Sequence, residues 1–79
     1  MEGLGPGYRR TVTRVRIRLN GAAHETSAAT VAALLEELAL PRQTVMVERN
    51  GEPVAREAWS SEPLNEGDGI EVLRVAAGG

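Results

Sequence analysis

The chain has 79 residues, which is the size of one small domain and leaves no room for a second. It contains no cysteine, and all nine of its basic residues are arginine, so disulfides, thiol nucleophiles, cysteine-based zinc sites and lysine chemistry are excluded. The net charge is −2, and no apolar run approaches the length of about 20 residues that spans a membrane, so we expect a cytoplasmic protein that binds neither membrane nor nucleic acid.

The start of the chain predicts a flexible leader followed by a β-hairpin. Residues 1–11 are rich in glycine and show no hydrophobic period, so we expect them to be flexible. From residue 13 to residue 19, apolar side chains alternate with arginines, which is typical of a half-buried strand. Asn20-Gly21 is a strong hairpin signal, and residues 22–26 are expected to form the returning strand.

The hydrophobic period changes over residues 30–40, which predicts an amphipathic helix of about three turns. Ser27 and Thr30 can each serve as the N-cap, and Pro41 marks the end. The apolar residues that fall on one helical face are Val31, Leu34, Leu35 and Leu38.

The second half of the chain predicts three further strands. Residues 44–49 alternate again, and Asn50-Gly51 then turns the chain. The short segment 52–55 contains Pro53, which cannot donate to a ladder, so this segment is expected at a sheet edge. Residues 69–75 alternate once more and form the last predicted strand.

Together these elements predict an α+β domain over residues 12–75. A mixed sheet of four or five strands with one main helix packed on one face buries every apolar face at once. The first and last strands are expected to pair in parallel at its centre. Residues 56–66 are irregular, and we expect Trp59 to pack this loop against the sheet edge, as a satellite of the core.

The outer face of the sheet has two interpretations. The arginines of the first strand could form cross-strand ion pairs with Glu71, and with Glu48 one strand further on, on a solvated face. Alternatively, the face could dock a partner, because exposed apolar side chains lie among its charges. The residues of this candidate partner face are Arg14, Arg16, Met46 and Leu73. The chain has only two aromatic residues, so it offers no stacking platform for nucleic acid.

Residues 76–79 (Ala-Ala-Gly-Gly) are expected to form a flexible tail. Such an end can simply be frayed, but two glycines without Cβ atoms can also pass through a channel where side chains would clash. Extended, residues 75–79 could reach about 16–18 Å from the sheet. The terminal carboxylate is ionised at pH 7 and can attack an activated phosphate.

The remaining polar residues do not assemble a catalytic site. His24 is the only histidine, so a metal site is not expected, and its default position is on the surface of the hairpin. Glu36 and Glu37 would lie on the solvated side of the helix. No nucleophile, base and oxyanion donors can be grouped, so the sequence does not predict an enzyme.

The sequence resembles the ThiS family of ubiquitin-like sulfur carriers, which serve thiazole formation in thiamin biosynthesis. The resemblance covers roughly residues 12–79 and depends on an ordered set of short segments more than on any single one. These segments are Leu19-Asn20-Gly21, residues 30–38 (TVAALLEEL), residues 45–51 (VMVERNG), Val54, Arg56, Trp59, residues 66–68 (EGD) and residues 75–79 (VAAGG).

The resemblance implies a β-grasp (ubiquitin-like) fold and a chemistry centred on the chain terminus. An E1-like enzyme of the ThiF type would bind ATP and adenylate the carboxylate of Gly79. Sulfur from a cysteine-desulfurase persulfide would then give a thiocarboxylate, and a thiazole synthase of the ThiG type would take that sulfur. Gly79 is then the covalent carrier, while Ala76, Ala77 and Gly78 are the residues by which partners recognise the tail. The chain itself would bind no cofactor.

Other interpretations stay open at this point. The small subunit of molybdopterin synthase and carriers for tRNA thiolation share the fold, the Gly-Gly end and the adenylation step. A β-grasp module that binds a ligand without covalent chemistry would differ, because it could lose the tail without consequence.

Overall fold

The computed structural model describes residues 13–75, so the leader expected over residues 1–11 and the tail expected over residues 76–79 lie outside the described residues. Two short 3-10 helices, η2 (Arg42–Thr44) and η3 (Arg56–Ala58), precede β3 and follow β4. In chain order, the other elements are β1 (Val15–Leu19), β2 (Ala22–Thr26), α1 (Val31–Glu37), β3 (Val45–Arg49), β4 (Glu52–Val54) and β5 (Gly69–Arg74).

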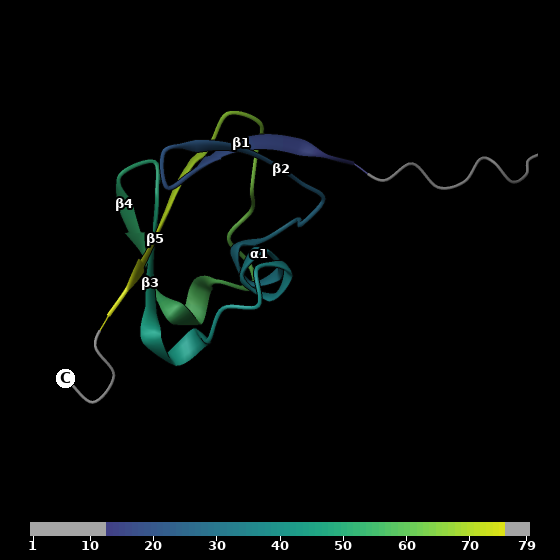
Figure 1. Ribbon diagram of the computed structural model, residues 1–79. Helices are drawn as coiled ribbons and strands as arrows, with labels where there is room; N and C mark the ends of the chain where they lie inside the picture. Colours follow the sequence, from purple (N-terminus) through teal and green to yellow (C-terminus); the bar gives the residue numbers. More distant parts are fainter. Residues whose placement is uncertain (1–12, 76–79) are drawn as a thin grey trace, which may run out of the picture.

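The strands form one mixed sheet in the order β2-β1-β5-β3-β4. β1 and β5 pair in parallel at its centre, and the other three pairings are antiparallel. The sheet curves around α1, which lies on one of its faces (Figure 1). The predicted α+β arrangement, with a mixed sheet and one main helix, is confirmed.

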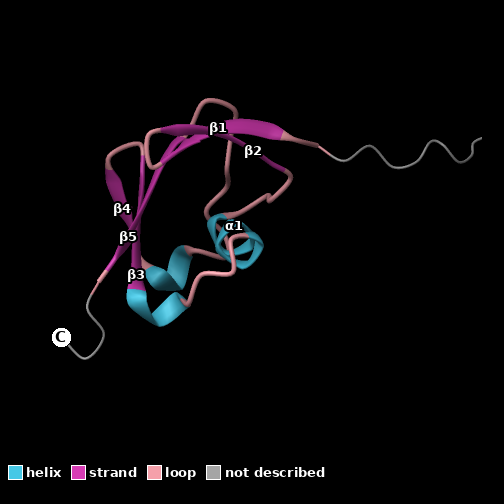
Figure 2. Cartoon of the chain, viewed as in Figure 1, coloured by secondary structure: helices cyan, strands magenta, loops and turns pink. Residues whose placement is uncertain are grey.

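Both Asn-Gly pairs form the tight turns that the sequence predicts. Asn20 and Gly21 have φ values of 50° and 85°, and Asn50 and Gly51 have 54° and 85°. Two consecutive positive φ angles define the turn whose twist matches a β-hairpin, and asparagine followed by glycine adopts them at low cost. Figure 2 shows both turns as short loops between neighbouring strands.

The core lies between α1 and the inner face of the sheet. Alternate residues of the strands point into it, and the predicted face of the helix covers them, as the periodicities of strand and helix require. The buried apolar side chains are Ile17, Val31, Leu34, Leu35, Val45, Val47, Trp59, Leu64 and Ile70.

Trp59 occupies a more central place than the sequence suggests. It is 1% exposed and is the largest of the fully buried side chains, so it belongs to the main core and not to a satellite. Its indole N–H donates to the carbonyl of Val54 on the edge strand at 3.0 Å. The sequence interpretation was therefore right about contact with the sheet edge and wrong about burial, because the loop folds back under the sheet.

The helix is shorter than predicted. Thr30 is its N-cap and accepts a hydrogen bond from the N–H of Ala33 at 3.2 Å, but the helix ends at Glu37 and not at residue 40. Ala39 adopts a φ of 57°, and the N–H of Leu40 donates to Leu35 O at 3.1 Å, which is the Schellman pattern of a helix end. No helix within residues 13–75 is long and apolar enough to cross a membrane.

Candidate functional site

β5 is the strand that carries the chain toward its last residues. It lies at the centre of the sheet, between β1 and β3. Beyond its end, the N–H of Val75 donates to the carbonyl of Thr44 at 2.8 Å. This hydrogen bond is the last described attachment of the chain, so β5 determines the place in the sheet from which the chain continues to residue 76.

The two turn asparagines hold the start of β5 from both sides. Asn20 donates its backbone N–H to Ile70 O at 2.8 Å, and its side-chain Oδ1 accepts from the N–H of Val72 at 2.7 Å. Asn50 donates its backbone N–H to Gly69 O at 2.7 Å, and its Oδ1 accepts from the N–H of Gly69 at 2.8 Å. Each asparagine therefore supplies one donor and one acceptor to the strand.

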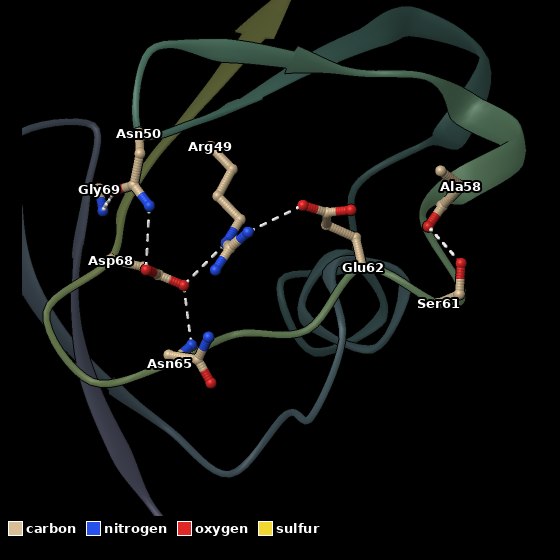
Figure 3. Close-up of polar contacts among 8 residues, drawn as sticks. All are labelled: Arg49, Asn50, Ala58, Ser61, Glu62, Asn65, Asp68 and Gly69. Carbon is tan, nitrogen blue, oxygen red and sulfur yellow. Dashed lines mark hydrogen bonds and ion pairs between the residues drawn. The ribbon is translucent and has the colours of Figure 1, made fainter.

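Asp68 is the centre of a polar network at the same place (Figure 3). Its Oδ2 accepts from the Arg49 side chain at 2.9 Å and from the Asn65 N–H at 2.8 Å, and its Oδ1 accepts from the Asn50 side chain at 3.1 Å. Arg49 also contacts Glu62 at 3.0 Å. The network joins the end of β3 to the turn before β5.

The network shifts the pKa values of Asp68 and Arg49 in the directions that favour their charged forms. Burial raises the pKa of Asp68, but the hydrogen bonds from Asn65, Asn50 and Arg49 outweigh burial and hold this pKa below its usual value. The hydrogen bond to Asp68 in turn raises the pKa of Arg49. The pair is therefore charged at neutral pH and fastens the beginning of β5.

Met46 and Leu73 lie side by side on the outer face of the sheet. They are register partners on β3 and β5, and their side chains are 49% and 43% exposed, the two large apolar side chains left open among the described residues. An apolar hollow of about 420 Å³ borders Met46 and is lined by Val54 and Trp59 among others. On its outer face, the end of the sheet from which the chain continues to residue 76 therefore presents two neighbouring apolar side chains.

Arg14 and Arg16 lie at the opposite end of the sheet. The parallel register pairs Arg18 with Gly69, so Arg16 is level with residue 67 and about 20 Å from Leu73 along the strands. Both guanidinium groups approach Glu25 at 3.9 Å. Of the four residues of the candidate partner face, the structure thus brings Met46 and Leu73 together and places Arg14 and Arg16 at the other end of the sheet.

The ion pairs that the first interpretation placed between the first-strand arginines and Glu71 or Glu48 are replaced by others. Within residues 13–75, Arg14 and Arg16 pair with Glu25 on the neighbouring hairpin strand, and Arg18 donates to the carbonyl of Gly21 at 3.4 Å. Glu71 instead lies opposite Glu48 in the register of β3 and β5. Two like charges directly opposite each other are unfavourable in a sheet.

Arg42 and Arg56 both approach the ring of Trp59. Their guanidinium carbons lie 5.2 and 5.4 Å from its centroid, within the range of a cation–π contact. Arg56 also donates to the carbonyls of Arg42 at 3.1 Å and Val45 at 3.1 Å. The two cations therefore cover the tryptophan and fix the loop that contains it.

His24 and Glu37 contact each other, although the sequence suggested two separate surface residues. His24 Nε2 lies 3.1 Å from Glu37 Oε2, and the hydroxyl of Thr26 donates to Glu37 Oε1. The hydrogen bond from Thr26 is the main cause that lowers the pKa of Glu37. This cluster joins β2 to α1. Within residues 13–75, no group of three or more His, Asp or Glu side chains is arranged to hold a metal ion.

The sheet order, the single helix held on one face and a central last strand that leads toward a Gly-Gly sequence define a β-grasp domain of the ubiquitin-like class. The sequence model described as the ThiS family matches residues 14–79. The chain therefore belongs to the ThiS family of ubiquitin-like sulfur carriers.

Two known proteins illustrate the relationship. The crystal structure of the thiamine biosynthesis protein ThiS from Geobacter metallireducens superposes with a TM-score of 0.71 at 32% identity, over 82% of this chain and 100% of that one. A protein named thiazole synthase from Paramagnetospirillum magneticum is 36% identical over 66 residues, which are 82% of this chain. The chain spans only 20% of the length of that relative.

Proposed function

We propose that this chain is the sulfur carrier for thiazole formation in thiamin biosynthesis, with the carboxylate of Gly79 as the group that carries the sulfur. The observation behind this proposal is that the ThiS-family match extends to Gly79 and so includes both terminal glycines. Residues 76–78 would be gripped by partner enzymes, and the folded domain would act as the handle. The chain itself would not be a catalyst.

The chemistry assigns each reactive group except the carboxylate to a partner. A ThiF-type enzyme binds ATP, the Gly79 carboxylate attacks the α-phosphate, and pyrophosphate leaves. A persulfide supplied by a cysteine desulfurase then attacks the acyl adenylate, and AMP leaves. A thiol cleaves the resulting disulfide and releases the thiocarboxylate. The chain supplies no sulfur atom for these steps from its own side chains, because it has no cysteine.

A ThiG-type thiazole synthase is the proposed acceptor of the sulfur. The relative named thiazole synthase is about five times as long as the segment that matches this chain. A carrier-like segment within a longer thiazole synthase would keep the two activities together, which supports the pairing of this chain with a thiazole synthase.

The exposed Met46–Leu73 pair is the proposed contact with these partners. It lies on the end of the sheet from which the chain continues to residue 76. An enzyme that holds Gly79 in its active site must lie within about 18 Å of Val75, since five residues extend no further. This pair is therefore within reach of any such enzyme.

Intact mass spectrometry tests the proposed function. The chain is incubated with a purified ThiF-type enzyme, ATP, a cysteine desulfurase and cysteine. We expect the mass of one oxygen-to-sulfur exchange at the C-terminus, and subsequent addition of a thiazole synthase with its substrates should reverse it. A chain that lacks Gly79 and a reaction without ATP are the controls. If the full chain keeps its mass with all of these components present, the proposal is wrong.

A further inference from the structure

β5 is paired with β3 over all but its first residue, but with β1 only at its beginning. The register joins β3 to every residue from Ile70 to Arg74, whereas β1 reaches only Gly69 and Ile70. After β1 ends, the turn at Asn20 leads the chain back into β2, and the side-chain oxygen of Asn20 accepts a hydrogen bond from the N–H of Val72. In Figure 1 the C-terminal half of β5 runs away from β1, alongside β3.

The register also shows which backbone groups point to the side where β1 has ended. The hydrogen bonds from Asn50 N–H to Gly69 O and from Val75 N–H to Thr44 O show that the backbone N–H and C=O groups of odd-numbered residues in and just after β5 point toward β3. The backbone groups of even-numbered residues therefore point to the opposite side, where β1 lies, as the hydrogen bond from Asn20 N–H to Ile70 O confirms. Among residues 13–75, the carbonyl of Val72 and both backbone groups of Arg74 have no hydrogen-bond partner.

We infer that this open edge of β5, the backbone of residues 72–74, is a strand-addition site for an extended segment of the enzyme that adenylates Gly79. The inference rests on the proposed function and adds how that enzyme holds the chain. Unpaired N–H and C=O groups on a strand edge are a template for another strand. Arg74 lies five residues from Gly79, so a segment paired there is at most about 18 Å from the reacting carboxylate.

The side chains at this edge indicate which amino acids the added strand would carry on each of its faces. Leu73 points to the outer face, where it is 43% exposed beside Met46, so an apolar side chain suits the same face of the added strand. Arg74 is exposed, shares the inner face with its register partner Val45, and forms no ion pair with residues 13–75. An acidic side chain therefore suits that face.

Replacement of Arg74 by proline removes the N–H that the inference requires. Pairing with β3 does not use this N–H, and proline is tolerated where the missing donor faces away from the sheet. Arg74→Ala is the matched control, because it removes the same side chain and keeps the N–H. We expect Arg74→Pro to weaken binding of a purified ThiF-type enzyme about tenfold relative to Arg74→Ala, measured by calorimetry.

Amide hydrogen exchange of the wild-type chain gives an independent readout. In the free chain the N–H of Arg74 should exchange fast and that of Leu73 slowly, because Leu73 faces β3. Addition of the enzyme should slow exchange at Arg74 at least about tenfold.

The outcomes separate the two proposals. If Gly79 is adenylated but exchange at Arg74 is unchanged and the proline and alanine variants bind equally, the open edge is not used and only this inference is wrong. If the enzyme does not adenylate the chain, the proposed function fails and the inference fails with it. Slower exchange at Arg74 at high concentration of the chain alone would identify a second copy as the occupant, and would overturn the inference.

Discussion

Arg49 and Asp68 form an ion pair in which the Nε and Oδ2 atoms are 2.9 Å apart, and this pair joins the end of β3 to the turn before β5. Asp68 is 7% exposed, and replacing it by asparagine removes its charge and turns one of its two acceptor oxygens into an NH2 donor, so at least one of the donors from Arg49, Asn50 and Asn65 is left without an acceptor. We expect Asp68→Asn to lower the free energy of unfolding by about 2 kcal/mol. Urea denaturation at pH 7 measures this loss, and an unchanged midpoint would contradict the assigned role.

The same carboxylate predicts how stability depends on pH. The pKa of Asp68 is lower in the folded chain than its usual value, which is near 3.9 in the unfolded chain. Its contribution is therefore fully present above about pH 4 and is lost as pH falls through the lower, folded value. The difference in stability between wild type and Asp68→Asn should shrink in acid. If the difference in the free energy of unfolding between the two proteins stays constant from pH 7 to pH 2, the ionised Asp68 carboxylate is not the source of this stability.

The asparagines of the two turns give a separate prediction. Asn20→Gly keeps a residue that accepts positive φ but loses the acceptor for the N–H of Val72. We expect it to lower the free energy of unfolding by about 1 kcal/mol. Asn20→Asp is the control, because it keeps both the acceptor and a tolerance for positive φ. Equal thermal midpoints for the glycine and aspartate variants would show that the side-chain hydrogen bond contributes nothing.

Local patterns were sufficient to predict most of the fold. Alternation identified the strands, the two Asn-Gly pairs identified the turns, and one apolar stripe identified the helix, because each of these signals lies within a few neighbouring residues. The mixed sheet with one helix followed from the need to bury every apolar face, and the parallel pairing expected between the first and last strands is confirmed. By contrast, Asp68 was recognisable only as a turn residue, since Arg49 and Asn50 lie 19 and 18 positions away.

The candidate site was predictable only in part. Met46 and Leu73 were expected on one outer face, and the structure makes them register partners. The distance from them to Arg16 depends on how far β1 is shifted along β5, and no local pattern contains that shift. The open edge of β5 depends on the same shift of β1 along β5, because it exists only where β1 has ended and β5 continues.

The end of α1 gives a prediction of increased stability. Ala39 has a φ of 57° and is exposed, and alanine is unfavourable in this conformation whereas glycine is not. We expect Ala39→Gly to raise the free energy of unfolding by about 1 kcal/mol. The same substitution within the helix, Ala33→Gly, should lower it by about 0.5–1 kcal/mol. Thermal denaturation of both variants tests the sign, and a loss of stability at position 39 would contradict the helix end described.

The Met46–Leu73 pair predicts an effect on activation that is separate from stability. Leu73 is on the outer face, so Leu73→Asp should leave the fold intact but place a charge in an apolar contact. We expect its adenylation by a ThiF-type enzyme, followed as pyrophosphate release, to fall at least about tenfold through a raised KM. Ala23→Asp is the matched control, because Ala23 is exposed on the same outer face but on β2, where its register partner is Arg18.

Arg16→Glu decides how far this contact extends across the sheet. Its side chain already contacts Glu25 and lies about 20 Å from Leu73, so we expect adenylation within about twofold of wild type. Circular dichroism should show all three variants folded, so that changes in KM report docking. Equal losses for Leu73→Asp and Arg16→Glu would mean that one partner spans the whole outer face. Wild-type kinetics for Leu73→Asp would remove the Met46–Leu73 pair from the contact.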